Sequence, residues 1–455
     1  MVAIIPDPVV ALRVLCAISC TYAVFMVSSR GRAYLVPSGV YFLASGAFIG
    51  LASLYLTQVG SLNEYGVLRD WAVVAFVTTV ATAIVVVALS VRWQLSWPSD
   101  AEMQRGSRPP VPRSPVNFQL TALILVGISQ IPPIRGLNIA LANATGVAGV
   151  MMLVLAAASR RVRMRWHGDA VLVSLAVVIP IIWVQLEFEG GGRLTLAGLG
   201  IATLVAWSLV RPRRVQKIVV VLAIPLFLIF SGLNRLEKDG ARNSGSSGVL
   251  TSGDGLSSMY GPLDTWTELV QVTPQDQARV RGASAGPRYG ATFLNTLLLP
   301  VPRSMWEDKP KGFGAELTEI LRPTLLREER IAPEHSMAAL INGEFYVNFG
   351  VPGLILLPFA VGWFLAALDR FHARVAARGL QTVDDWFRAT ILVCLVSSLG
   401  DLFWVGTFTF MSRAGLSALV VWIVYRLTTR RSPAPPDPAP LDQEPSARVP
   451  AERMS

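Results

Sequence analysis

The sequence predicts an all-α polytopic membrane protein with about eleven transmembrane helices and one large extracytoplasmic loop. Three observations support this prediction. Hydrophobic residues make up 52% of the 455-residue chain and charged residues only 15%, whereas an average soluble protein carries about 25% charged residues. The apolar residues recur in blocks of roughly 20, the length that crosses about 30 Å of hydrocarbon. One long polar stretch, residues 234–343, interrupts these blocks.

Each apolar block is taken as one helix. The predicted spans are residues 8–28, 35–57, 71–93, 118–134, 137–159, 169–186, 194–210, 215–233, 345–368, 386–403 and 411–427. The first span is expected to stay in the protein as a membrane helix rather than to be cleaved as a signal peptide, because no basic region precedes it and no small-residue cleavage site follows it. The chain then divides into N-terminal membrane helices (1–233), the polar loop (234–343), C-terminal membrane helices (344–431) and a disordered tail (432–455).

The connecting loops predict the orientation. Basic residues cluster after the first, third, fifth, seventh, ninth and eleventh spans, and the alternate short loops hold few. Cytoplasmic loops collect Lys and Arg, so we expect the N-terminus and the polar loop outside and the C-terminal tail in the cytoplasm. These loops account for most of the net charge of +10, so no nucleic-acid partner is expected. The acidic pair at 384–385 then marks the N-terminus of a cytoplasmic helix.

The polar loop has local patterns of its own. Residues 240–258 are rich in Gly and Ser and predict a flexible lead. Residues 292–299 are apolar enough to dip into the membrane interface. Residues 315–329 place apolar side chains on roughly one helical face, which predicts a helix lying on the membrane surface or packed over the spans. The Pro-rich segments 99–115 and 432–455 are expected to be unstructured.

Several kinds of chemistry lack their motifs in this chain. There is no Walker A loop, no complete His/Glu zinc pattern and no Gly-x-Ser-x-Gly elbow. The adjacent Glu307 and Asp308 are few ligands for a divalent cation. No metal and no cofactor are therefore expected. A reaction on the outer face would have to use an already activated substrate, since nucleotides are absent there.

A group of cations lies in the polar loop. Its members are Arg281, Arg288, Arg303, Lys309 and Lys311. Arg binds phosphate through two parallel N–H groups, and Lys binds it as a point charge. Such a group can hold a lipid-linked pyrophosphate. The alternative is a solvated basic loop in contact with anionic headgroups.

Other polar residues on the predicted outer side are also candidates. His335 is the one histidine expected there, and a histidine can take a proton from a sugar hydroxyl. Glu344 begins the ninth predicted span, where a carboxylate serves as a base, as a partner of an arginine, or as a helix-start residue favoured by the dipole. Asp401 and Arg413 bracket the last outer turn and either line a membrane cavity, where Arg413 would bind the substrate, or form a structural pair.

Three short segments occur in a suggestive order. They are Arg-Tyr-Gly at 288–290, Pro-Arg-Ser-Met-Trp-Glu-Asp-Lys-Pro at 302–310, and Gly-Glu-Phe-Tyr-Val-Asn-Phe-Gly at 343–350, entering a span. In this order they resemble the Wzy-type oligosaccharide repeat-unit polymerases, also called O-antigen or capsule polymerases. The similarity is tightest over residues 260–362 and elsewhere concerns the span pattern only.

The resemblance implies a glycosyltransferase with a GT-C-like helical fold in the bacterial cytoplasmic (inner) membrane. Such enzymes join polyprenyl-pyrophosphate-linked oligosaccharides into a surface polysaccharide on the outer face, without a nucleotide. Implied partners are these lipid-linked glycans and membrane lipids, with a chain-length regulator and a flippase as candidates. The matching positions are Arg288, Arg303 and Lys309 for pyrophosphate, and Glu344, Tyr346 and Asn348 for the shape of the site. Catalytic candidates are His335, Glu344 and Arg303. The related O-antigen ligases look to use an outer-loop histidine as base, and His335 is the candidate equivalent in this chain.

Two other functions are open at this point. An O-antigen-ligase-like transferase would move a finished glycan to an acceptor. A non-catalytic transporter or flippase would carry lipid-linked glycan across the membrane. Transporters often show repeated halves and charges at mid-membrane, and neither is clear in this sequence.

Overall fold

The computed structural model describes residues 7–30, 36–59, 65–95, 115–159, 193–210, 253–272, 288–301, 305–306, 309, 312–323, 328 and 336–429. Every regular element in these ranges is helical, and no strand occurs among them. The all-α class is therefore confirmed for the part of the chain that the structure describes.

Seven of the described helical segments are long and apolar enough to cross a membrane. They are α1 (Pro8–Arg30), the continuous α2–η2–α3 (Pro37–Ser45, Gly46–Leu51, Ala52–Val59), α4 (Tyr65–Arg92), α8 (Ile139–Ser159), α18 (Val351–Arg378), α19–α20 (Val383–Ser397, Leu399–Trp404) and α21–η3–α22 (Thr407–Phe410, Met411–Gly415, Leu416–Thr429). Two shorter apolar stretches lie in α6 (Val116–Ser129) and α10 (Arg193–Val210). The predicted spans at 169–186 and 215–233 lie outside the described residues, and all the others overlap one of these helices.

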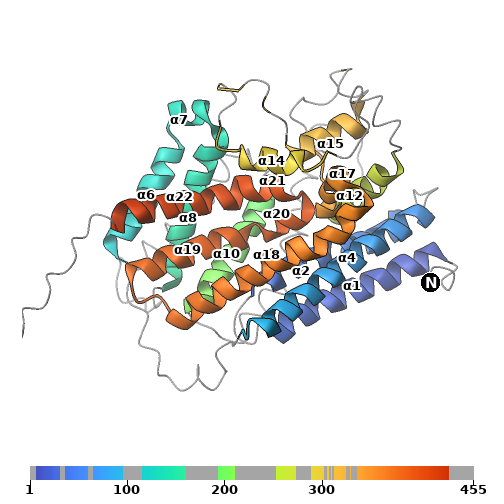
Figure 1. Cartoon of the computed structure of the whole chain (residues 1–455), viewed down its shortest axis with the longest axis horizontal. Coiled ribbons are helices and arrows are strands. Elements are labelled where there is room, and N and C mark those ends of the chain that lie inside the picture. The colour runs from blue at the N-terminus through green and yellow to red at the C-terminus, as the bar shows by residue number, and fades with distance from the viewer. Residues whose placement is uncertain are drawn as a thin grey trace, which may run out of the picture.

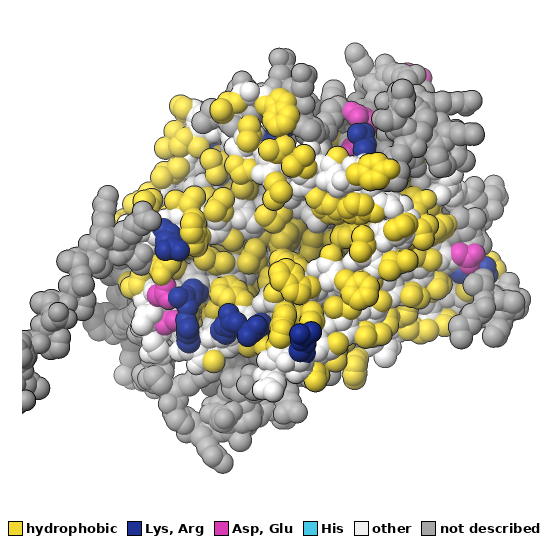
Figure 2. Space-filling view, in the orientation of Figure 1, with side chains coloured by type: hydrophobic (Ala, Val, Ile, Leu, Met, Phe, Trp, Pro, Cys, Tyr) yellow, Lys and Arg dark blue, Asp and Glu magenta, His cyan; other side chains and the backbone are white. Residues whose placement is uncertain are grey.

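The exterior of the bundle is apolar. Exposed side chains include Ile84 and Val91 on α4 and Ile355, Phe359 and Trp363 on α18, and Figure 2 shows a broad hydrophobic surface across one face. A monomeric soluble protein rarely exposes a patch of more than a few hundred Å². This surface and the long apolar helices are those of a polytopic membrane protein.

The two halves of the sequence share one core. Helix α4 packs along α18, α6 packs along α8, and α2 packs against α20. Tyr41 on α2 contacts Phe42 and Phe403 edge to face, with ring centroids 5.4 and 5.2 Å apart. The N-terminal and C-terminal membrane helices therefore form a single packed unit.

A buried carboxylate on α18 caps another helix. Asp369 accepts hydrogen bonds from the backbone N–H of Ser38 (2.9 Å) and from its hydroxyl (2.7 Å). Ser38 lies in the first turn of α2, where backbone N–H groups have no partner within the helix. This contact, which the sequence analysis missed, fastens the C-terminal part of α18 to the start of α2.

The polar loop contains folded helices at one end of the bundle (Figure 1). They are α12 (Gly253–Gln271), α14 (Ala291–Leu297), α15 (Phe313–Leu321) and α17 (Leu340–Phe349), the last of which crosses the predicted boundary at 343/344. The predicted flexible lead at 240–258 is wrong for residues 253–258, which begin α12. Tertiary packing explains the difference: Trp266 of this helix is fully buried, and its indole N–H donates to the carbonyl of Trp71 at 3.1 Å.

The ninth predicted span, 345–368, starts too early and ends too early. The chain forms the short helix α17, breaks at Gly350 with φ +66°, and begins the 28-residue helix α18 at Val351. Glycine adopts this left-handed conformation without a Cβ penalty. Pro352 suits the first turn of α18, where its missing N–H costs no helical hydrogen bond.

The end of α6 and the start of α19 (Val383–Ser397) also test the predicted helix boundaries. The predicted span 118–134 ends at Ser129, and Pro132 and Pro133 begin the separate helix α7 (Pro132–Leu137). The acidic pair at 384–385 does start a helix, as predicted. Asp385 and Thr382 form a reciprocal capping box at the N-terminus of α19.

The two segments of the loop singled out for their apolar side chains, 292–299 and 315–329, overlap α14 and α15. Leu317 and Ile320 of α15 are buried in the core, which favours a helix packed over the spans. On α14, Leu294 and Leu297 are exposed whereas Thr292 is buried, so this helix turns its polar side inward and its apolar side outward. Segments 99–114 and 430–455 lie outside the described residues.

Candidate functional site

The site is assembled where the turn before α14 meets the end of α17. The backbone N–H of Arg288 donates to the carbonyl of Val347 at 3.1 Å, and that of Tyr289 donates to the carbonyl of Asn348 at 2.9 Å. The last carbonyls of a helix have no donor within the helix, so the turn supplies donors that α17 lacks. Two of the segments singled out in the sequence, 288–290 and 343–350, therefore lie against each other.

Glu344 joins three elements at this place. Its carboxyl group is fully buried, and Oε1 accepts hydrogen bonds from the hydroxyls of Thr292 (3.0 Å) and Thr407 (2.7 Å). Oε2 accepts from the backbone N–H of Thr407 at 2.6 Å. Thr292 lies on α14 and Thr407 is the first residue of α21, so Glu344 of α17 caps the start of the continuous segment α21–η3–α22. A carboxylate is favoured at a helix N-terminus by the helix dipole.

A glycine makes this close approach to the helix N-terminus geometrically feasible. Gly406 has φ +105°, and a Cβ at this position would lie 2.4 Å from Oε2 of Glu344. No side chain larger than hydrogen fits there without displacing the carboxyl group. Gly406 therefore belongs to the site, although the sequence analysis did not identify it.

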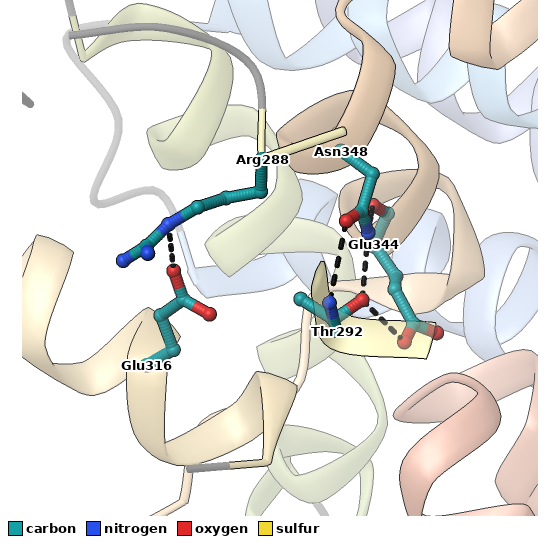
Figure 3. A network of polar contacts seen from close by, with 5 residues as sticks. All are labelled: Arg288, Thr292, Glu316, Glu344 and Asn348. Atoms are coloured by element: carbon teal, nitrogen blue, oxygen red, sulfur yellow. Dashed lines mark hydrogen bonds and ion pairs between the residues drawn. The ribbon is translucent and has the colours of Figure 1, made fainter. Parts of the chain in front are cut away.

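Asn348 completes the network one turn further along α17. Its side-chain amide N donates to the Thr292 hydroxyl (2.6 Å) and to the carbonyl of Glu344 (2.7 Å). Its Oδ1 accepts a longer bond from the Thr292 backbone N–H at 3.4 Å. Figure 3 shows Glu344 and Asn348 converging on Thr292. The predicted site residues Glu344 and Asn348 are thus brought together, with a threonine as the residue between them.

The surroundings of Glu344 shift its ionisation. Burial raises the pKa of this carboxyl group above its usual value, and hydrogen bonds from the Thr407 backbone, the Thr407 hydroxyl and the Thr292 hydroxyl oppose the rise. A base at this position would have to exchange one of these bonds for a substrate hydroxyl. The geometry therefore favours a positioning role for Glu344, and its predicted role as a base stays a prediction.

Arg288 is held beside this network by a carboxylate. Its Nε lies 2.6 Å from Oε1 of Glu316, in the first turn of α15. The Glu316 side chain is 10% exposed and that of Arg288 is 38% exposed. Figure 3 shows the guanidinium of Arg288 beside the Glu316 carboxylate. The ion pair thus holds the arginine through Nε, and the side chain stays partly exposed.

Lys309, another predicted pyrophosphate ligand, is engaged with the backbone. Its Nζ donates to the carbonyl of Val301 at 2.8 Å and more weakly to that of Leu299 at 3.4 Å. The residue is buried, and these bonds stabilise the turn after α14. The described contacts do not connect Lys309 with Arg288.

Tyr346 lies on α17 between the two network residues in sequence but packs elsewhere. Its ring lies 5.7 Å from that of Trp266 and 6.5 Å from that of Trp71, and those two rings lie 5.5 Å apart. These aromatic contacts join α17 to α12 and α4. Asn342 adds a polar link to α4, donating to the Thr78 hydroxyl at 2.7 Å.

Asp401 and Arg413 form a direct pair across the last hairpin. The Arg413 Nη1 lies 2.9 Å from Oδ1 of Asp401, whose side chain is 4% exposed. Of the two interpretations open from the sequence, the structural pair is the one that these contacts support. The proposal of Arg413 as a substrate ligand would require a second partner at its remaining nitrogens.

Four of the predicted site residues lie outside the described part of the chain. These are Arg281, Arg303, Lys311 and His335, and the same holds for the Glu307–Asp308 pair. Within the described ranges, no group of three His, Cys, Asp or Glu side chains is placed as metal ligands would be.

The sequence analysis missed the threonines of the site. Thr292 and Thr407 supply all three hydrogen bonds to the Glu344 side chain, yet nothing in the local sequence distinguishes them from other threonines of this chain. Glu316 could have been noticed, since an acidic residue near the N-terminus of an expected helix is a recognisable signal.

Comparison of the chain with protein-family models, with curated proteins and with solved structures finds no match.

Proposed function

We propose that this chain is an extracytoplasmic membrane glycosyltransferase that polymerises polyprenyl-pyrophosphate-linked oligosaccharide repeat units. In this proposal it has about eleven spans and a GT-C-like fold, with the polar loop on the outer face. The likeness of its three short segments to the Wzy-type polymerases supports the proposal, as does the absence from the sequence of motifs for nucleotide-driven chemistry.

One structural observation carries most weight. Residues 288–290 and 343–350 are separated by about fifty residues in the chain, yet they meet through the backbone bonds of Arg288 and Tyr289 to α17. The buried network of Glu344, Thr292 and Asn348 fixes this junction. A partly exposed arginine is thereby held on a rigid support at the end of the membrane bundle.

The proposed reaction uses this arginine for the leaving group. The bond between the anomeric carbon of the donor glycan and its pyrophosphate oxygen breaks, and pyrophosphate leaves on its lipid carrier. Cations aimed at the developing charge stabilise it in a water-poor site. Arg288 offers its terminal nitrogens for this contact, with Arg303 as the second arginine proposed from the sequence.

The acceptor glycan supplies the nucleophile of the transfer. A hydroxyl at the non-reducing end of the incoming unit forms the new bond to the anomeric carbon and gives up its proton to a base. His335 is the proposed base, since a histidine near its ordinary pKa accepts a proton close to neutral pH. Glu344 acts through Thr292, keeping α14 and the adjoining Arg288 in place.

Deletion of the gene tests the proposal. Cells lacking it should accumulate single lipid-linked repeat units and make no long polymer. Normal polymer length would contradict the proposal. Long polymer that is made but not attached to its acceptor would instead identify a ligase, and a failure of lipid-linked units to reach the outer face would identify a transporter.

A further inference from the structure

A second candidate site lies at the opposite end of the bundle. Helix α18 has 28 residues, so its two ends are about 42 Å apart. The junction with α17 lies at one end, and at the other a pocket of about 390 Å³ opens between the ends of α18, α19 and α22. Its lining includes Arg374, Arg378, Asp385, Arg388, Trp422 and Arg426. This volume is in the range of roughly 300–1,000 Å³ typical of small-molecule sites.

The pocket is strongly basic. Among the described residues that line it, four are arginines and Asp385 is the one carboxylate. Oδ2 of Asp385 already accepts two hydrogen bonds from Thr382, at 2.9 and 2.8 Å. Arg388 is paired with Asp384 at 2.7 Å, one turn away on α19. Asp385 and Asp384 are therefore engaged by Thr382 at the start of α19 and by Arg388.

The remaining arginines are left for an external anion. Among the described residues, no carboxylate forms an ion pair with Arg374, Arg378 or Arg426. The first two lie one turn apart on α18 and are exposed. The guanidinium of Arg426 lies over the Trp422 ring, 5.2 Å from its centroid, which directs it toward the pocket wall. Three cations from two helices thus surround one hollow, and phosphate is the anion whose geometry arginine matches in bidentate fashion.

The position of the pocket favours a lipid over a soluble anion. Trp422 lines the pocket and is itself 44% exposed, and its neighbour Ile423 is exposed beside it on a predicted span. Figure 2 shows basic side chains along the lower margin of the hydrophobic face. The apolar wall on one side suits the acyl chains of a phospholipid, and the arginines on the other suit its phosphate. Tryptophan is also typical of membrane interfaces.

We propose that this pocket binds the phosphate of an anionic phospholipid, in the leaflet that the charge distribution predicts to be cytoplasmic. Basic pockets between transmembrane helices recognise such headgroups. The bound phosphate would neutralise Arg374, Arg378 and Arg426 together and join the ends of α18 and α22. This inference does not depend on the proposed glycosyltransferase activity.

Native mass spectrometry of the purified full-length protein tests it, with phosphatidylglycerol or phosphatidylcholine of the same chain length added in equal amounts. Phosphatidylglycerol should stay bound where phosphatidylcholine does not. Each basic residue near an anionic headgroup contributes about fivefold in affinity, so the double variant Arg374→Ala/Arg378→Ala should bind phosphatidylglycerol about 30-fold more weakly. Arg370→Ala is the matched control, because Arg370 lies on the same helix over the Trp93 ring and does not line the pocket.

The possible outcomes decide the proposal. Equal retention of the two lipids would overturn it, as would equal losses in the double variant and in Arg370→Ala. Displacement of the lipid by inorganic phosphate at matched concentration would show a soluble anion as the ligand and overturn the lipid assignment. If the double variant does not fold, Arg426→Ala decides: about fivefold weaker binding supports the proposal, and unchanged binding refutes it.

Discussion

The variant Glu344→Ala tests the buried junction most sharply. It removes the acceptor of three hydrogen bonds, from the Thr407 backbone N–H at 2.6 Å and from the hydroxyls of Thr407 and Thr292 at 2.7 and 3.0 Å. The Thr407 hydroxyl can rotate and bond to the Thr296 hydroxyl instead, since the two Oγ1 atoms are 3.4 Å apart. The Thr407 N–H has no such freedom, because its direction is fixed by the backbone.

The expected magnitude follows from these contacts. A buried donor left without a partner costs about 1–3 kcal/mol, and the cavity left by the missing side-chain atoms adds to this. We expect Glu344→Ala to lower the free energy of unfolding by about 2–4 kcal/mol. Glu344→Gln keeps the volume and one carbonyl oxygen that can accept from the Thr407 N–H, so its cost should be about 1 kcal/mol.

Unfolding in detergent or bicelles, followed by circular dichroism, measures these differences. Met305→Ala provides the control, since Met305 is a 77% exposed side chain of the same polar loop and exposed substitutions usually fall within about 0.5 kcal/mol. Equal losses for the alanine and glutamine variants would show that the charge, rather than the hydrogen bonds, matters. A Glu344→Ala protein as stable as Met305→Ala would show that these hydrogen bonds do not stabilise the junction.

Further predictions concern the same region. Because the pKa of Glu344 is raised in the folded protein, the native state binds more protons above the ordinary carboxyl pKa of about 4.3. Wild type should therefore lose stability relative to Glu344→Gln as the pH rises from that value through the folded pKa, and parallel profiles would contradict this. Gly406→Ala should cost at least about 1 kcal/mol in thermal unfolding, whereas Gly400→Ala, where a Cβ meets open space, should not. Arg288→Ala should slow polymer formation about 10- to 100-fold without loss of expression, with partial recovery in Arg288→Lys. Arg303→Ala should abolish polymerisation while expression stays intact, and Arg303→Lys should not restore it fully; wild-type polymer from the alanine variant would remove Arg303 from the site.

Hydropathy predicted the seven described helical segments that are long enough to cross a membrane, because the length of an apolar block is set by the bilayer. The first predicted span, 8–28, nearly matches α1 (Pro8–Arg30). The break before α18 was also readable, since Gly350 and Pro352 are stop and start signals within an apolar run. The start of α12 was not, because its Gly- and Ser-rich residues form a helix only through tertiary packing of the segment around Trp266.

The polar site was only partly predictable. Glu344 stood out as a carboxylate at the start of a predicted span, and Asn348 was predicted only through the resemblance to the Wzy-type polymerases. Thr292 and Thr407 did not stand out, because threonines such as Thr82 occur throughout these helices with hydroxyls bonded to their own backbone. Which threonines turn toward a carboxylate depends on how α14 and α21 pack against α17, and that is a tertiary property.

Elongation of lipid-linked units by the purified protein is the most direct test of the proposed polymerase activity. Wild-type protein would be reconstituted in liposomes with polyprenyl-pyrophosphate-linked repeat units and without nucleotide, and the products separated by length. We expect a ladder of polymer that Arg288→Ala reduces strongly and Arg370→Ala leaves unchanged. Single units that never lengthen, with wild-type protein that is folded and correctly inserted, would contradict it.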